Sequence, residues 1–286
     1  MLDIQKVRAS LPRKTAHTFA RDALEHVSLR AGGLFAGLIM MVQQMEFALG
    51  DVSGNRKFAL MAKRLATVDK EEAAEAKAAF VLRLRARGIR DLALLRALEK
   101  VPREIFVPHR YVDLARRDLS LPIGCGQTLS EPWLIARMIE ALAPAAQHRV
   151  LEIGTGSGYA TAILAELAHA VLSIERFHSL AIAARLRLES CGLTNVAIVF
   201  GDGLSVPRDA GIFDRILVHG RLDAVPSRLT DVLAADGKIV MARADPALAG
   251  RQILVELSCA SDGSLTERSR GSCRLQAIVP GLARVF

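Results

Sequence analysis

A run from Val150 to Gly158, Val-Leu-Glu-Ile-Gly-Thr-Gly-Ser-Gly, carries the strongest chemical signal in this sequence. Its apolar beginning predicts a buried strand. Its three glycines, Gly154, Gly156 and Gly158, predict a tight turn, because glycine adopts backbone conformations that a Cβ disfavours. Open α/β sheets bind ligands at the carboxyl ends of their strands. The run therefore predicts a ligand-binding loop between a strand and a helix.

The spacing within this loop indicates which ligand is bound. A dinucleotide loop reads G-x-G-x-x-G and places pyrophosphate on a helix N-terminus, whereas the third glycine here comes one residue early. Glu152 stands two positions before the first glycine, and its carboxylate would repel pyrophosphate. The same carboxylate suits a ligand with an ammonium and a sulfonium. We therefore expect S-adenosylmethionine, and an NAD-dependent oxidoreductase is the less favoured alternative.

Two more acids follow the next strands along the chain. Glu175 ends an apolar run at roughly the 20-residue offset at which an acid pairs with ribose hydroxyls. Asp202 lies in Gly201-Asp-Gly203, where its carboxylate could accept from an adenine amino group. Each acid alone is more typical of a solvated loop. Three acids at the ends of successive strands are more specific, and together they favour a cofactor site.

Strand and helix patterns alternate from residue 149 onward, which predicts an α/β fold with a doubly wound, mostly parallel sheet. Helices are expected at Tyr159–Ala168, Leu180–Ser190 and Ser227–Leu233. Asp262-Gly263 predicts a hairpin, so that the last two strands run antiparallel. Seven strands are expected in all, at Arg149–Ile153, Ala170–Ile174, Val196–Phe200, Phe213–Val218, Lys238–Ala242, Gln252–Leu257 and Leu265–Ser269.

The N-terminal part divides at Met61. Residues 1–60 could be an interaction arm, a helical cap, or sequence upstream of an internal start at Met61, and the last is slightly favoured. Residues 61–286 form the expected catalytic domain, with a helical and substrate-loop part at 61–148 and the sheet at 149–286. Asp69 is expected to cap a helix that stops at Gly88, and Asp91 a second helix that ends before Pro102.

Composition excludes several classes of protein. The chain is 51% hydrophobic and 24% charged, as globular proteins are. A net charge of +8 is spread along the chain without a nucleic-acid motif, so a nucleic-acid partner is not favoured. The apolar run at Ala31–Val42 is too short to span a membrane. The cysteines, Cys125, Cys191, Cys259 and Cys273, lack zinc spacing, so we expect no metal, free thiols and a cytoplasmic protein.

Residues from about Leu82 to Val279 resemble the protein-L-isoaspartate O-methyltransferase family. The most specific stretch is Leu121–Ser130 with Pro132, which reads Leu-Pro-Ile-Gly-Cys-Gly-Gln-Thr-Leu-Ser and lies ahead of the glycine loop. The remaining segments are the glycine loop itself, Val101–Pro108, Gly201–Gly203, Phe213–Ile216 and Val225-Pro226. The glycine loop alone is common to many methyltransferases.

The resemblance implies a class I, Rossmann-like methyltransferase with N-terminal helices. It would transfer a methyl group from S-adenosylmethionine to the free carboxylate of L-isoaspartyl residues in damaged proteins, which begins their repair through a succinimide. The family's catalytic serine matches Ser130. Its cofactor contacts match Gln127, Thr128, Leu129, Ser130, Glu152, Gly154, Thr155, Gly156, Ser157, Gly158, Glu175, Asp202 and Gly203. Oligomeric state is not determined by these patterns.

Two features leave alternatives open. Ser130 precedes a helix start at Glu131-Pro132, so it could be an N-cap, a substrate ligand, or both. After the fourth strand the family carries a run of small residues, whereas this chain reads His219-Gly-Arg-Leu-Asp-Ala-Val-Pro226. His219 and Arg221 are candidate substrate-binding residues there. The acceptor could therefore be another carboxylate or a small molecule, and a non-catalytic cofactor-binding module is the third hypothesis.

Overall fold

The computed structural model describes residues 74–260 and 262–283. The N-terminal extension 1–60, the possible start at Met61 and the expected cap at Asp69 lie outside the described residues. Within them, a helix covers residues 74–86. It ends as predicted at Gly88, whose φ of +104° is left-handed, and the Gly88 and Ile89 N–H groups donate to the carbonyls of Arg85 and Leu84.

Helix α5 spans Leu92–Lys100, and the Asp91 side chain caps it by accepting from the Leu94 N–H at 2.9 Å. Two 3₁₀ helices follow, Arg103–Phe106 and His109–Leu114. A short antiparallel pair, β1 (Leu121–Pro122) and β2 (Thr128–Leu129), encloses a single 3₁₀ turn at Gly124–Gly126. This pair was not predicted, because two-residue strands have no hydrophobic period to detect.

The main sheet has seven strands in the order β5-β4-β3-β6-β7-β8-β9. Strands β3 to β7 are parallel, and β8 and β9 add antiparallel. Their bounds are β3 Arg149–Ile153, β4 Ala170–Glu175, β5 Val196–Phe200, β6 Phe213–Arg221, β7 Leu233–Ala244, β8 Gln252–Cys259 and β9 Leu265–Cys273. The prediction of a mostly parallel seven-stranded sheet is confirmed. Strand order reverses at β3, so the carboxyl ends of β3 and β6 border the crevice where such sheets bind ligands.

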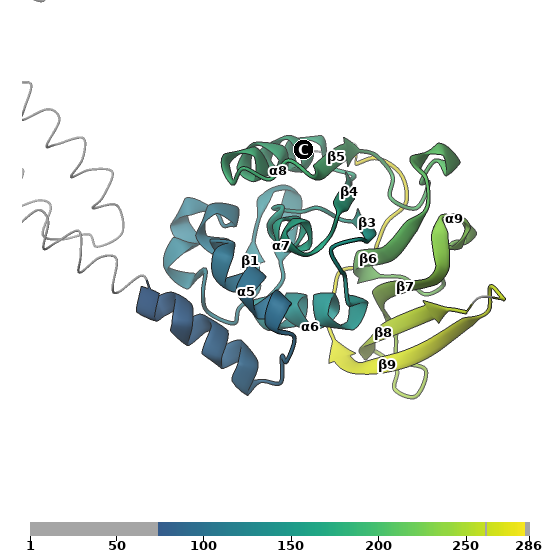
Figure 1. Ribbon diagram of the computed structural model, residues 1–286, viewed down its shortest axis with the longest axis horizontal. Coiled ribbons are helices and arrows are strands. Elements are labelled where there is room, and N and C mark those ends of the chain that lie inside the picture. The colour runs from purple at the N-terminus through teal and green to yellow at the C-terminus, as the bar shows by residue number, and fades with distance from the viewer. Residues whose placement is uncertain (1–73, 261, 284–286) are drawn as a thin grey trace, which may run out of the picture. The chain divides into compact units, whose positions relative to one another are not determined.

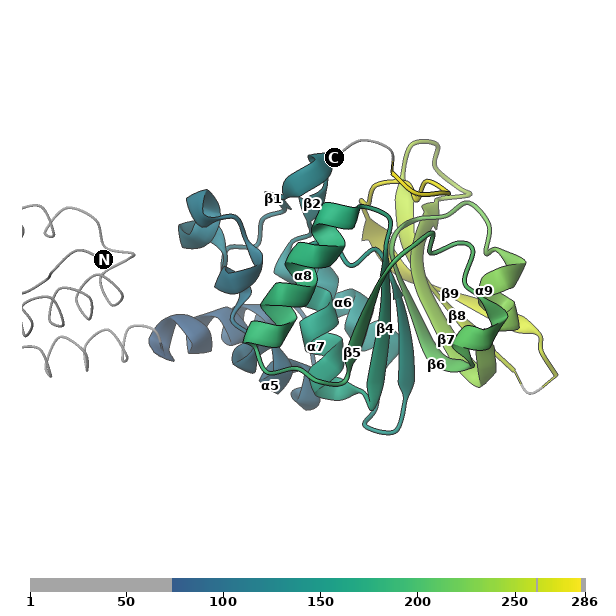
Figure 2. The same ribbon diagram turned by 90° about the horizontal axis from the view of Figure 1, so that it is seen from above.

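Helices cover both faces of the sheet, as a doubly wound fold requires. Figure 2 shows α6 (Pro132–Leu142), α7 (Tyr159–Leu167) and α8 (His178–Ser190) on one side of the strands, with α9 (Ser227–Asp231) on the other. In Figure 1 the antiparallel pair β8–β9 forms the sheet's yellow edge. None of the described helices is long and apolar enough to cross a membrane.

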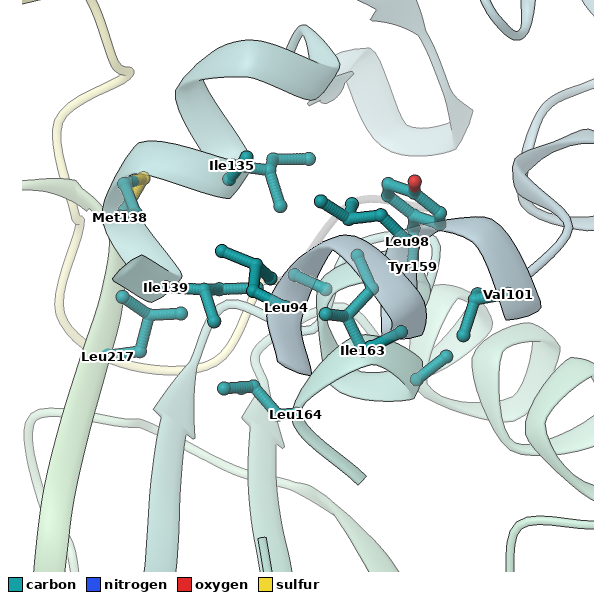
Figure 3. Packing of buried hydrophobic residues seen from close by; sticks show 14 of the residues in the cluster. Leu94, Leu98, Val101, Ile135, Met138, Ile139, Tyr159, Ile163, Leu164 and Leu217 are labelled. Carbon is teal, nitrogen blue, oxygen red and sulfur yellow. The ribbon is translucent and has the colours of Figure 1, made fainter. Parts of the chain in front are cut away.

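The sheet separates two apolar cores, because side chains alternate between its faces. In β6, Leu217 faces the larger core while Ile216 and Val218 belong to the other. Figure 3 shows the larger core, where residues of α5, α6 and α7 interdigitate beside Leu217. Helices α6 and α7 hold in place the segments that lead into their N-termini. These segments are the loop before α6 and the glycine turn before α7.

Strands β6, β8 and β9 extend beyond their predicted ends, to Arg221, Cys259 and Cys273, and the largest boundary error lies between α9 and β7. The helix expected at Ser227–Leu233 ends at Asp231, and β7 begins at Leu233, five residues before the predicted strand. The Phe213 N–H donates to the carbonyl of Val232, and Phe213 pairs with Leu233. Burying Phe213 and Leu233 together in the second core outweighs extending the helix by two residues. The chain then passes an irregularity at Asp236, whose φ is +60°.

Candidate functional site

A cavity of about 680 Å³ lies at the carboxyl ends of the parallel strands. Four groups of residues line it: the loop before α6, the glycine turn after β3, the ends of β4, β5 and β6, and the C-terminal segment Arg274–Val279. Such a volume is typical of a small-molecule or cofactor site. The predicted residues that line it are Gln127, Thr128, Leu129, Ser130, Gly154, Thr155, Gly156, Ser157, Glu175, Asp202, Gly203 and His219.

The glycine turn exposes backbone to this cavity. Gly154 and Gly156 both have positive φ, +90° and +56°, a conformation in which other residues are strained. Gly158 also has a positive φ but does not line the cavity. A Cβ on Gly158 would lie 3.2 Å from the Ala184 Cβ. Its role is therefore close packing of α7 against α8, and the first two glycines form the wall.

Glu175 organises the wall next to the turn. Its carboxylate accepts from the Gly156 N–H at 2.8 Å and from the Phe177 N–H at 3.0 Å. The residue is 4% exposed and lines the cavity. Burial raises the pKa of Glu175, while the backbone N–H donors oppose that rise. The remaining acceptor capacity of the carboxylate is available to hydroxyl groups of a ligand.

Glu152 lies beneath the cavity rather than in its wall. The side chain is fully buried and accepts hydrogen bonds from Thr161 Oγ1 at 2.5 Å and Ser173 Oγ at 2.6 Å. Its other oxygen lies 2.8 Å from His219 Nε2. His219, at the end of β6, does line the cavity. The direct contact of Glu152 with a cofactor that the sequence predicts would thus require His219 to move.

Asp202 and Gly203 follow β5. Burial acts to raise the pKa of Asp202, but hydrogen bonds from the N–H groups of Leu204 and Gly281 and from the Ser205 hydroxyl outweigh it and lower the pKa. Asp202 is therefore ionised at neutral pH. A Cβ on Gly203 would lie 2.4 Å from the Ile153 Cγ2. Only glycine lets the backbone here approach β3, and this approach brings Asp202 to the cavity.

Ser130 lies where the short strand β2 leads into α6. Among the described residues its hydroxyl has no hydrogen-bond partner. The alternative that Ser130 is an N-cap is not observed: Glu131 occupies the N-cap position, and the Asp118 carboxylate accepts from the Trp133 N–H at 3.0 Å. The half-buried hydroxyl is thus free for a ligand in the cavity.

Arg221 is not part of the cavity wall. Its side chain lies 3.8 Å from the Asp223 carboxylate. Its main-chain N–H and carbonyl both form hydrogen bonds with the C-terminal segment Arg274–Val279. The Arg221 N–H donates to the carbonyl of Gln276, and the Ile278 N–H donates to the carbonyl of Arg221. Arg221 holds that segment through its main chain. The sequence-based assignment of its side chain to substrate stays a prediction.

Sequence reasoning missed much of the wall. Gln252 uses its side-chain amide to hold the backbone of Leu275 through two hydrogen bonds, at 3.1 and 2.8 Å. Arg176 donates from Nε to the carbonyl of Gly281 at 3.0 Å. No local motif marks these residues. The lining residues that were not predicted include Ser120, Arg176, Phe177, Gln252 and the whole of Arg274–Val279.

Comparison with known proteins shows which family this chain is similar to. Residues 75–281 match the model of the family described as protein-L-isoaspartate(D-aspartate) O-methyltransferase. A protein-L-isoaspartate O-methyltransferase of Rhodopseudomonas palustris (strain BisA53) is 47% identical over 73% of this chain and 95% of its own length. One of Bradyrhizobium sp. (strain BTAi1 / ATCC BAA-1182) is 45% identical over 73% of this chain and 95% of its own length.

Solved structures agree in fold. A structure named protein-L-isoaspartate O-methyltransferase is 26% identical to this chain, with a TM-score of 0.63, and the match covers 72% of this chain and 67% of that one. A second, from Plasmodium falciparum, is described as a putative enzyme of the same name in complex with S-adenosyl-L-homocysteine. It is 22% identical, has a TM-score of 0.61, and the match covers 70% of this chain and 97% of that one. At that identity the second structure supports the fold alone.

Proposed function

Because the chain belongs to the protein-L-isoaspartate(D-aspartate) O-methyltransferase family, we propose that its cavity transfers a methyl group from S-adenosylmethionine to the free carboxylate of L-isoaspartyl residues in damaged proteins. This transfer initiates their repair. One observation carries the proposal for the site: the unpaired hydroxyl of Ser130 lines the same cavity as the glycine turn and Glu175. An acceptor group and a cofactor can therefore meet in one cavity.

The wall fits S-adenosylmethionine. The positive φ values of Gly154 and Gly156 leave backbone without side chains facing the cavity. Glu175 can accept from ribose hydroxyls and Asp202 from an amino group, because both side chains are carboxylate acceptors. Gln127, Thr128 and Leu129 line the same cavity, in the segment that leads to Ser130. Glu152 lies fully buried below the turn and holds His219 of the wall through a hydrogen bond.

The chemistry asks little of acid–base groups. An acceptor carboxylate is already ionised at neutral pH, so no general base is needed. S-adenosylmethionine, when bound, supplies a methyl group carried on a sulfonium. The Ser130 hydroxyl donates a hydrogen bond to the acceptor carboxylate and orients it. Such orientation can lower a barrier by roughly 7–11 kcal/mol in the most favourable cases.

A changed acceptor is the second candidate, and the His219–Pro226 run favours it. His219 reaches into the cavity where the family carries small residues, and it narrows the space beside Gly154. A His219 ring at this place can contact a substrate carboxylate as well as Glu152. Arg221 does not line the cavity, so its side chain can contact only those parts of a substrate that extend beyond the cavity. Either residue would alter which carboxylate is accepted while the cofactor site stays the same.

The partners follow from this chemistry. Proteins or peptides that contain isoaspartate are the substrates, and the proposal requires neither nucleic acid nor a membrane. A cytoplasmic location is supported by the cysteines Cys125, Cys191, Cys259 and Cys273, all of which are free. A non-catalytic, cofactor-binding module is disfavoured by the free Ser130 hydroxyl, because binding the cofactor alone does not need an acceptor ligand.

The test is transfer of labelled methyl from S-adenosylmethionine to an isoaspartyl peptide and to the matching aspartyl peptide. We expect base-labile label on the isoaspartyl peptide alone. Ser130→Ala should lose turnover and keep cofactor binding. The control is Ser190→Ala at the exposed end of α8, where the hydroxyl only donates to the carbonyl of Arg187.

Two outcomes would contradict the proposal. Cofactor binding without transfer to either peptide would reject the isoaspartyl acceptor and leave the changed-acceptor candidate, to be tested with small carboxylic acids. Equal turnover by Ser130→Ala and Ser190→Ala would remove Ser130 from the reaction.

A further inference from the structure

Arg103 is a buried arginine in the 3₁₀ helix Arg103–Phe106, and the chemistry proposed above does not use it. Its exposed fraction is 2%. Arginine is rarely buried to this extent without a paired acid. Among the described residues no carboxylate forms an ion pair with Arg103. Glu104, next to it in the chain, instead pairs with Arg116.

The guanidinium contacts the wall of the cavity from behind. Arg103 Nη2 donates to the main-chain carbonyl of Ser130 at 2.9 Å, and the carbonyl of Leu119 lies 3.5 Å from the same nitrogen. The guanidinium carbon lies 4.9 Å from the ring centre of Tyr159. Ser130 and Tyr159 line the cavity, whereas Arg103 does not. Arg103 thus connects the segment Gln127–Ser130, called the acceptor loop below, to the first residue of α7.

The charge of Arg103 persists at neutral pH. Burial lowers its pKa to about 10, while nearby Tyr159, Glu131 and Glu104 oppose that fall. Its Nε and Nη1 atoms reach no acceptor among the described residues. A buried charge with unpaired donors is costly. An apolar side chain of the same length would fill this space at less cost, and what the guanidinium adds in return is its bond to the Ser130 carbonyl.

Arg103 holds the main chain of the acceptor loop through the Ser130 carbonyl. Strands β1 and β2 pair over only two residues each, and the first turn of α6 has no side-chain cap at Glu131. Local structure therefore restrains Ser130 weakly. The guanidinium, which bonds the Ser130 carbonyl and lies over the Tyr159 ring, sets the loop's position relative to the glycine turn.

We infer that Arg103 is a positioning residue, which fixes the main chain of Ser130 so that its hydroxyl faces the acceptor. The inference rests on the proposed function for its kinetic readout only. It predicts that Arg103 affects turnover through Ser130 more strongly than it affects cofactor binding, since Arg103 bonds Ser130 directly and contacts no part of the turn Gly154–Gly158, Glu175 or Asp202.

The kinetic test compares Arg103→Met and Arg103→Lys with Arg116→Met in the full chain. The control removes the neighbouring cation that pairs with Glu104 and does not contact the acceptor loop. We expect kcat to fall about ten- to hundredfold in Arg103→Met, as for loss of one charge-assisted hydrogen bond. Arg103→Lys should fall less. S-adenosylhomocysteine affinity should change less than kcat in Arg103→Met, because Arg103 bonds Ser130 and contacts neither Glu175 nor Asp202.

A double-mutant cycle with Ser130→Ala separates positioning from general stability. If Arg103 acts through Ser130, then Arg103→Met should reduce the residual activity of Ser130→Ala by no more than about threefold. A full additional loss in that background, or an equal loss in Arg116→Met, would overturn the inference.

A third measurement does not depend on turnover. Hydrogen exchange of the 128–131 segment should be faster in Arg103→Met than in Arg116→Met, because one anchor of its main chain is gone. Equal exchange would overturn the inference even if the wild-type chain methylates another acceptor. Absence of isoaspartyl methylation by the wild-type chain, in contrast, would reject the proposed function alone.

Discussion

Replacement of Glu152 tests the buried network under the cavity. The carboxylate accepts from Thr161, Ser173 and His219. In Glu152→Ala all three donors lose this acceptor. Ser173 keeps a partner, because its hydroxyl lies 2.6 Å from Thr155 Oγ1, and His219 faces the cavity, where water can reach it. Thr161 is fully buried and is left without a partner among the described residues.

The expected magnitude follows from this count. One orphaned buried donor costs about 1–3 kcal/mol, and loss of the charge-assisted bonds adds roughly 1 kcal/mol. We therefore expect Glu152→Ala to lower the free energy of unfolding by about 2–4 kcal/mol. Glu152→Gln should lower it by less than about 1.5 kcal/mol, since the amide oxygen can still accept from both hydroxyls and a neutral His219 can accept from the amide NH₂.

The assay is equilibrium unfolding in urea, followed by the fluorescence of Trp133, the single tryptophan of the chain. Trp133 lies in α6 between the guanidinium groups of Arg87 and Arg137, so unfolding changes its surroundings. Thr161→Val is the matched control, because it removes one donor and leaves the carboxylate. Equal destabilisation by the Ala and Gln variants would refute the hydrogen-bond count.

Three further predictions concern the cavity wall. Burial raises the pKa of Glu175. At a pH between the ordinary glutamate pKa and this raised pKa, the folded chain therefore holds a proton that the unfolded chain has lost. The free energy of unfolding then falls as the pH rises through this range. Ligand hydroxyls need the ionised form; S-adenosylhomocysteine affinity should therefore weaken as pH falls through the raised pKa, and a titration of Glu175→Gln should lack this step. Gly203→Ala should cost about 1–3 kcal/mol of stability, because its Cβ meets Ile153 at 2.4 Å; thermal unfolding against Gly201→Ala, whose Cβ would lie 3.4 Å from Ile174, checks this, and equal losses would contradict it. Gln252→Ala should speed hydrogen exchange in residues 275–279, since both bonds to Leu275 are lost; unchanged exchange would show that another contact holds the segment.

The strands and most helices were predictable because their signals are local. Hydrophobic runs between turn residues identify seven strands, and Asp91 and Gly88 define helix ends through bonds to residues three to five positions away. The boundary between α9 and β7 was not predictable, because it depends on Phe213, which is about 20 residues away in the chain and pairs with Leu233.

The cofactor side of the site was also visible in the sequence. Glycine spacing and the acids after successive strands place the turn, Glu175 and Asp202 at one sheet edge, since parallel strands end together. The family resemblance added Ser130. By itself the sequence thus determined the fold and predicted the residues that line the cavity beside the glycine turn, while Ser130 as the acceptor ligand stays a prediction from the resemblance.

Tertiary structure decided how those residues are held. The bond between His219 and Glu152 joins residues 67 apart, and the bond from Arg103 to the Ser130 carbonyl joins residues 27 apart. Gln252 holds Leu275 from a neighbouring strand, and Arg221 faces the cavity-lining segment with its main chain rather than its side chain. No periodicity or motif encodes these contacts, because each depends on which elements pack together and in what register.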